Sequence, residues 1–125
     1  MTLPSPVFPL IRTGGVDGIR VSFGDKLSEP ANRAALAFRV AVEAEGWDAI
    51  EETSSTLVSC FIRFDPLRLS HAVVKAKVET LAKSRNWFDA ALPTGRRFWR
   101  IPTVYGTELA PQLAQAAAAA GMSEA

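Results

Sequence analysis

The same order of elements occurs twice in the first 86 residues: two strand-like segments are followed by a segment with helical spacing of apolar residues. In Ile19–Phe23 the apolar residues fall at every second position, which is the period of a strand with one buried face. Val58, Cys60 and Ile62 alternate in the same way. This repeated order predicts an α+β fold, a two-layer β-β-α-β-β-α domain whose helices cover one face of a four-stranded antiparallel sheet.

The first helix is bounded by strong signals at both ends. Ser28 can accept hydrogen bonds from the free N–H groups of a first turn, and Pro30 loses no hydrogen bond there. Gly46 suits a left-handed C-terminal cap. We therefore predict a helix over residues 29–45.

The second helix follows a strand that stops at Asp65-Pro66. Ser70 can cap it, and Val74, Val78 and Leu81 repeat at helical spacing, which predicts a helix over residues 71–85.

Two turns complete the predicted hairpins. Gly14–Gly18 joins a short strand in Val7–Thr13 to the strand at Ile19, and the polar run Thr53–Thr56 joins strands at Trp47–Glu52 and Leu57–Phe64.

The remainder of the chain lies outside this repeat. We expect the two-layer domain to occupy residues 1–86 and a linker to occupy residues 87–95. Residues 96–125 then carry a fifth strand at Arg96–Tyr105 and an alanine-rich helix at Ala110–Ala120, closed by Gly121.

Composition narrows the classes of function. A net charge of +1 is too small for the broad positive field that nucleic-acid binders use, so we expect no nucleic-acid partner. Apolar runs are too short to span a membrane, and the Pro-rich start does not resemble a secretion signal. The single cysteine, Cys60, cannot form an intrachain disulfide, which favours a cytoplasmic location.

Few side chains suggest chemistry, and we predict no catalytic, cofactor-binding or metal-binding residue. Cys60 has the position of a small core residue, and His71 that of an exposed residue near a helix cap without other metal ligands nearby. Glu51 and Glu52 are strand neighbours and should point to opposite faces. The glycines at 14 and 15 lead into a strand, so a turn is preferred to a phosphate loop.

Interaction residues are easier to predict than catalytic ones. If Cys60 and its alternating neighbours face the helices, the other sheet face carries Leu57, Phe61 and Arg63, with Phe61 as the central anchor. Arg97 and Trp99 belong to the predicted fifth strand, where basic and aromatic residues alternate. We expect self-association through these residues, giving a homo-oligomer.

Three stretches resemble the family of 5-oxoprolinase B-type subunits, also known as allophanate hydrolase subunit 1 or KipI-like proteins. Gly18–Asp25 is similar to the family's opening strand, which ends in Phe-Gly-Asp, and Ile62–Leu67 is similar to a strand running into Tyr-Asp-Pro. Arg100–Leu113 resembles the family's Ile-Pro-Val-x-Tyr-Gly-Gly-Glu-x-Gly-Pro-Asp-Leu, with Thr107 and Ala110 replacing glycines and Gln112 replacing aspartate.

The resemblance implies a protein with a carboxyltransferase domain, subdomains C and D, in which residues 96–125 begin a cyclophilin-like barrel. We expect this sequence to be the N-terminal part of a longer subunit and inactive alone. The complete complex would hydrolyse 5-oxoproline to L-glutamate with ATP, together with a partner that resembles the family's C-type subunits and a lactam-utilisation protein. The alternative is a KipI-like regulatory domain that binds and inhibits a sensor histidine kinase.

Overall fold

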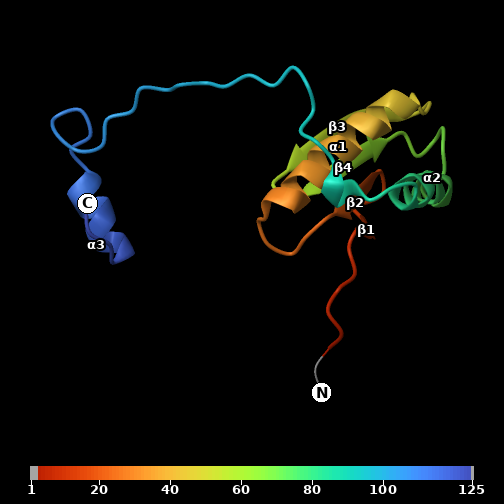
Figure 1. The fold of residues 1–125 in the computed structure, drawn as a ribbon, viewed down its shortest axis with the longest axis horizontal. Coiled ribbons are helices and arrows are strands. Elements are labelled where there is room, and N and C mark those ends of the chain that lie inside the picture. Colours follow the sequence, from red (N-terminus) through yellow and green to blue (C-terminus); the bar gives the residue numbers. More distant parts are fainter. Residues whose placement is uncertain (1–2, 125) are drawn as a thin grey trace. The chain divides into compact units, whose positions relative to one another are not determined.

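Four antiparallel strands form the sheet of the computed structural model, which describes residues 3–124 (Figure 1). They are β1 (Leu10–Thr13), β2 (Gly18–Ser22), β3 (Ile50–Thr56) and β4 (Ser59–Phe64), in the spatial order β1-β2-β4-β3. The chain divides into two compact units, residues 1–95 and 96–125. The sheet lies in the first unit, and the predicted four-stranded α+β fold is confirmed there.

Two helices cover one face of the sheet. Helix α1 (Glu29–Glu45) has the predicted bounds, with the Ser28 hydroxyl accepting from the backbone N–H of Ala31 and Gly46 in the left-handed conformation. Helix α2 (His71–Lys83) starts where predicted and ends two residues earlier than predicted. None of the helices within residues 3–124 is long and apolar enough to cross a bilayer.

The core lies between the sheet and these helices. Ile19, Cys60 and Ile62 are fully buried from the sheet side, and Phe38 is fully buried from α1. The Phe38 ring lies 5.6 Å from Phe23 and 5.0 Å from Trp87, between ring centroids. Aromatic pairs at such tilted geometries add to the stability gained from burial.

Trp87 corrects the prediction that residues 87–95 are only a linker. It begins a short 3-10 helix, η1 (Trp87–Asp89), and is 2% exposed. Its indole N–H donates to the carbonyl oxygen of Ala82 at 3.0 Å, so the buried polar atom is satisfied. Residues after α2 thus complete the core of the first unit.

The second hairpin turn is displaced from its predicted place. Thr53–Thr56 continue strand β3, and the chain reverses at Leu57 and Val58. Leu57 has φ 24°, a value that non-glycine residues seldom adopt. The prediction of a turn in the polar run is wrong because threonine also fits well on the half-exposed surface of a strand.

The second unit differs from its prediction. Within the described residues, Arg96–Tyr105 has no strand partner, so the predicted fifth strand is not formed. Strand structure requires hydrogen bonds to a neighbour, and the alternating sequence alone does not supply them. Helix α3 (Leu113–Ala120) is shorter than predicted and ends at Gly121 in the left-handed conformation, as expected.

Candidate interaction surfaces

The face of the sheet opposite the helices is open, and Phe61 lies at its centre. Strand alternation places Phe61 there because Cys60 and Ile62 are buried on the helix side. Its ring lies against the β1–β2 hairpin, where a Cβ added at Gly18 would be 2.4 Å from the ring and one added at Gly14 would be 2.7 Å from it. A side chain at either position would therefore have to displace the ring, and Phe61 is half-buried by its own domain.

Arg63 lies on the open face, and its positive charge is neutralised by two glutamates. Its guanidinium forms ion pairs with Glu51 and Glu52, the latter at 3.3 Å from Nε. The prediction that the two glutamates point to opposite faces is therefore wrong. An irregularity in the β3–β4 register between Ile50 and Glu52 explains this, because a bulge sets two residues of one strand against one of its partner.

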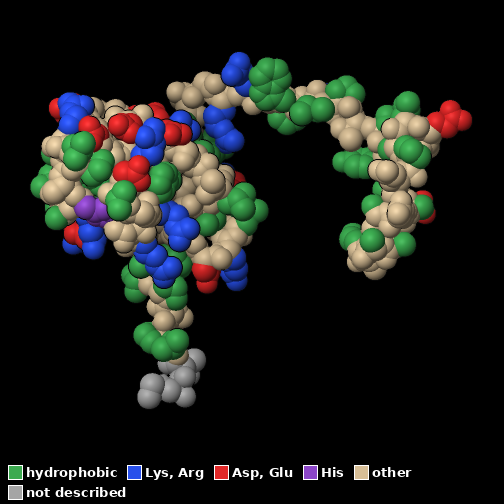
Figure 2. Space-filling view, turned by 180° about the vertical axis from the view of Figure 1, so that it is seen from behind, with side chains coloured by type: hydrophobic (Ala, Val, Ile, Leu, Met, Phe, Trp, Pro, Cys, Tyr) green, Lys and Arg blue, Asp and Glu red, His purple; other side chains and the backbone are tan. Residues whose placement is uncertain are grey.

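Leu57 lies at the turn rather than beside Phe61. Its side chain is 65% exposed, and its carbonyl oxygen accepts a hydrogen bond of 2.6 Å from the side-chain amide of Asn32 in α1. The bond ties the β3–β4 turn to the helix layer. Figure 2 shows basic and acidic side chains intermingled over the part of the first unit that it displays.

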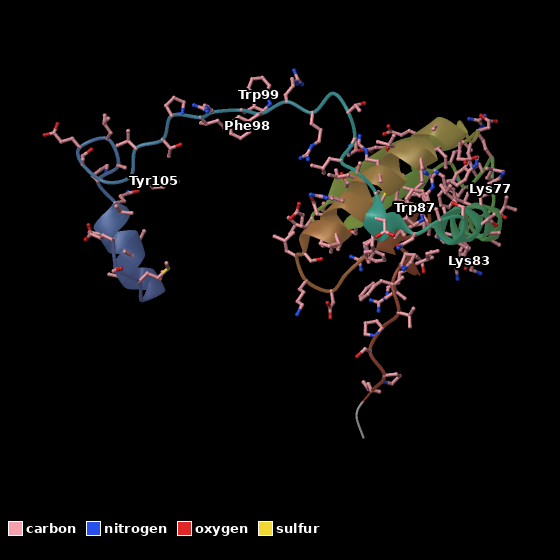
Figure 3. The ribbon with its side chains drawn as sticks, viewed as in Figure 1. Lys77, Lys83, Trp87, Phe98, Trp99 and Tyr105 are labelled. Atoms are coloured by element: carbon pink, nitrogen blue, oxygen red, sulfur yellow. The ribbon has the colours of Figure 1, made fainter. Side chains whose placement is uncertain are left out.

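The other two predicted interaction residues belong to the second unit. The Arg97 guanidinium lies 5.2 Å from the centroid of the Trp99 ring, within the range of a cation–π contact. Trp99 is 69% exposed, and Figure 3 shows Phe98, Trp99 and Tyr105 along an extended segment. The structure therefore divides the five predicted residues between two units: Phe61 and Arg63 in strand β4 and Leu57 in the turn before it, and Arg97 and Trp99 in residues 96–105.

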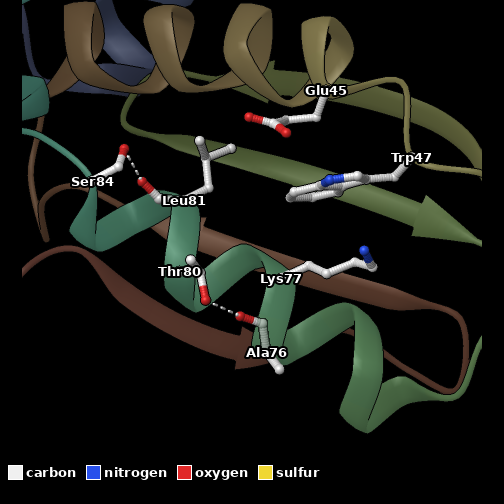
Figure 4. Close-up of a pocket in the computed structure, with 7 residues that line it drawn as sticks. All are labelled: Glu45, Trp47, Ala76, Lys77, Thr80, Leu81 and Ser84. Carbon is white, nitrogen blue, oxygen red and sulfur yellow. Dashed lines mark hydrogen bonds between the residues drawn. The ribbon is translucent and has the colours of Figure 1, made fainter.

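A groove that the sequence did not indicate lies between the end of α1 and α2 (Figure 4). Its volume is about 440 Å³, and the indole of Trp47 forms one wall. The Lys77 ammonium is 5.8 Å from the centroid of that ring. Glu45 lies on the opposite side of the ring from Lys77 (Figure 4). Trp47 and Lys77 are far apart in the sequence, so only the packing of α2 beside the α1 terminus brings them together.

Neither side chain considered for chemistry is placed to react. Burial raises the pKa of the Cys60 thiol to about 12, so the nucleophilic thiolate is scarce at neutral pH. His71 is half-buried rather than exposed: Nε2 lies 3.2 Å from the carbonyl oxygen of Gly18, and its ring meets Phe64 edge-on at 5.4 Å. Across residues 3–124, no group of three or more His, Cys, Asp or Glu side chains could hold a metal ion.

The sequence of the chain matches one known protein family. The family profile described as carboxyltransferase domain, subdomain C and D, matches residues 9–125, nearly the whole sequence. The chain belongs to this carboxyltransferase-domain family. The match confirms the resemblance to 5-oxoprolinase and allophanate hydrolase subunits that the three stretches indicated. No protein of curated function matches the chain.

Solved structures share the fold of this carboxyltransferase-domain chain. PH0987, a conserved uncharacterized protein from Pyrococcus horikoshii, is 24% identical with a TM-score of 0.56, over 92% of this chain and 51% of that one. TTHA0988, in two crystal forms, is 25% and 26% identical with TM-scores of 0.53 and 0.52. Those alignments cover 92% and 87% of this chain but 20% and 19% of TTHA0988. The chain thus spans about half of PH0987 and about a fifth of TTHA0988.

Proposed function

We propose that this chain is the N-terminal scaffold and interaction domain of a subunit of an ATP-dependent 5-oxoprolinase. The observation that carries the proposal is the carboxyltransferase-domain match over residues 9–125. In this role the domain supports the rest of the subunit and provides surface for contacts with partner subunits. The ring of 5-oxoproline is opened to L-glutamate at a site formed by the rest of the subunit and its partners. The burial and raised pKa of Cys60 support a structural role for the chain's one cysteine.

The second unit has a place in this proposal. Phe98, Trp99 and Ile101 are all exposed, and the backbone of residues 96–105 has no strand partner in the described part of the chain. In a longer subunit this segment would become the first strand of a cyclophilin-like barrel, which would cover the exposed side chains. Soluble monomeric proteins seldom expose several large apolar side chains so close together.

Reconstitution tests the enzymatic proposal. The full-length subunit should co-purify with a C-type partner and a lactam-utilisation protein, and the three together should convert 5-oxoproline to L-glutamate with ATP. Omitting the subunit should abolish turnover. The 125-residue chain alone should hydrolyse neither ATP nor 5-oxoproline, and turnover by a pure preparation of it would contradict a scaffold role.

A regulatory role is the second candidate. The groove beside Trp47 and the open sheet face offer solvent-accessible surfaces on which a protein partner could dock. Under this alternative the chain binds a sensor histidine kinase and lowers its autophosphorylation. Inhibition of a kinase by the 125-residue chain, with no 5-oxoprolinase activity in the reconstituted mixture, would favour the regulator.

We also propose that the chain associates with copies of itself, whichever of the two roles it has. The exposed apolar side chains of residues 98–105 would gain free energy by pairing between two copies. Sedimentation of the 125-residue chain should show a homo-oligomer, and Trp99→Ser should shift it toward monomer. A monomer at all concentrations would contradict self-association without bearing on the enzymatic role.

A further inference from the structure

Two arginines on the open sheet face lack the acidic partners that Arg63 has. Arg12 of β1 and Arg20 of β2 are directly opposite each other in the antiparallel register, and both are exposed. Like charges at such positions repel, because their Cβ atoms are about 5 Å apart. Neither arginine forms an ion pair with any residue between 3 and 124. The sheet therefore places two positive charges side by side, and neither has an ion-pair partner among residues 3–124.

A groove of about 290 Å³ lies over this pair of arginines. Its polar lining residues include Arg12, Arg20, Ser22 and Ser59, and the Ser59 hydroxyl is hydrogen-bonded to that of Thr56 at 3.0 Å. Its apolar wall includes Phe8 and Leu10, both half-buried. The volume is near the lower end for small-molecule pockets, which combine apolar walls with a few polar groups.

The charged residues that line the groove indicate the charge of a ligand that would fit it. Asp25 also lines it, without an ion pair to either arginine. Two positive charges and one negative charge leave a net charge of +1, which a ligand with one negative charge would neutralise. Guanidinium groups match carboxylates in planar, bidentate hydrogen bonds, and the Ser22 hydroxyl is a further possible donor.

We infer that this groove binds the carboxylate of a small organic acid with an apolar body. Arg12 and Arg20 hold the carboxylate, and the body of the ligand lies against Phe8 and Leu10. An inorganic anion would satisfy the arginines but would gain nothing from the apolar wall. The inference rests on the open sheet face alone and is independent of the proposed enzymatic function.

Titration of the 125-residue chain with benzoate, followed by amide NMR, tests this site. Benzoate has one carboxylate on an apolar ring. Saturable shifts should be confined to residues 8–13, 18–25 and 58–59. Arg12→Gln and Arg20→Gln should each weaken binding about tenfold, since a hydrogen bond to a charged group is lost. Asp25→Asn should strengthen it, because the ligand then meets one fewer negative charge.

Two controls separate a built site from general attraction. Arg63→Gln removes the same charge from the same sheet face, but from a residue already paired with glutamates, and should leave benzoate binding within about twofold. Inorganic phosphate should bind more weakly than benzoate. Dispersed amide spectra and unchanged or raised melting temperatures of the Arg12 and Arg20 variants would show that they fold.

Three results would overturn the inference. Benzoate that causes no saturable shifts would exclude the site. An equal loss of affinity in Arg63→Gln would show that only net charge matters. Phosphate that binds as tightly as benzoate would exclude an organic acid as the preferred class, because the apolar wall would then contribute nothing.

Discussion

Residues 3–95 and 96–124 both carry many apolar side chains, but many of the large ones are buried in the first region, whereas most of them are exposed in the second. In the first region Phe38 is fully buried and both main helices have side-chain N-caps. In the second region Phe98 is 86% exposed, and α3 has neither a buried residue nor a side-chain N-cap. Apolar residues stabilise a fold only where the chain also supplies a second layer to cover them. The first region specifies its fold from its own residues, and the second does not.

The largest expected difference between the regions is in core truncation. Phe38→Ala should lower the free energy of unfolding by about 3–5 kcal/mol, because it leaves a cavity beside Phe23 and Trp87. Phe98→Ala removes the same side chain from an exposed position and should change it by less than about 0.5 kcal/mol. Urea unfolding followed by circular dichroism measures both. Equal effects would show that the second region shares the cooperative core.

Glycine replacement should give a smaller contrast. Gly18→Ala should cost about 1–3 kcal/mol, because its Cβ would lie 2.4 Å from the Phe61 ring and 2.5 Å from the backbone oxygen of Gly14. Gly121→Ala is the control in the second region, where a Cβ meets nothing within 4 Å and only the end of α3 is strained. Thermal unfolding of the first region should be unchanged by it. A Gly18→Ala protein of unaltered stability would contradict the close approach of Phe61.

The buried thiol gives the first region a dependence on alkaline pH. Cys60 has its pKa raised from 9.0 to about 12 in the folded chain, so above pH 9 the unfolded chain loses a proton that the folded chain retains. Stability should then fall as pH rises from 9 toward 12, by up to about 1.4 kcal/mol per pH unit. Comparison with Cys60→Ala isolates this contribution, since the variant lacks the titrating group. Parallel pH profiles for the two proteins would refute it.

Helix caps should show the smallest contrast. Ser28→Ala removes the hydroxyl that accepts from Ala31 at 3.3 Å and should cost about 1 kcal/mol. Gln112, at the equivalent position before α3, makes no side-chain cap bond, so Gln112→Ala should have no measurable effect on unfolding. Denaturant midpoints of the two variants provide the measurement. A loss in the second variant as large as in the first would mean that α3 contributes to the measured transition.

Much of the first region could be predicted because its determining signals are local. The bounds of α1 follow from Ser28, Pro30 and Gly46, each of which acts on its own backbone or on the adjacent turn. The burial of Cys60 and Ile62 follows from period-two alternation. The order of strands and helices follows from the same patterns, so the fold of the first region was predictable.

Contacts between distant residues were not predictable in this way. Trp87 follows α2 in a stretch without periodicity, and its contact with Phe38 in α1 joins residues that are far apart in the sequence. The bulge that turns Glu51 and Glu52 toward Arg63 has no marker in strand β3 itself. Both grooves depend on such contacts: the Trp47 groove on the packing of α2 beside α1, and the groove over Arg12 and Arg20 on the pairing of β2 with β4, which sets Ser22 opposite Ser59.

The bulge in β3 has a consequence for how the sheet meets other chains. Both outer strands expose unpaired backbone groups, which are templates for edge-to-edge aggregation. On β3 the bulge interrupts the regular spacing of these groups and the adjacent glutamates bring negative charge to it, while β1 is only four residues long. An incoming strand would find regularly spaced backbone on β3 only beyond the bulge, over residues 52–56. The ion-paired bulge therefore shortens the edge to which another strand could be added in a fibril-like manner.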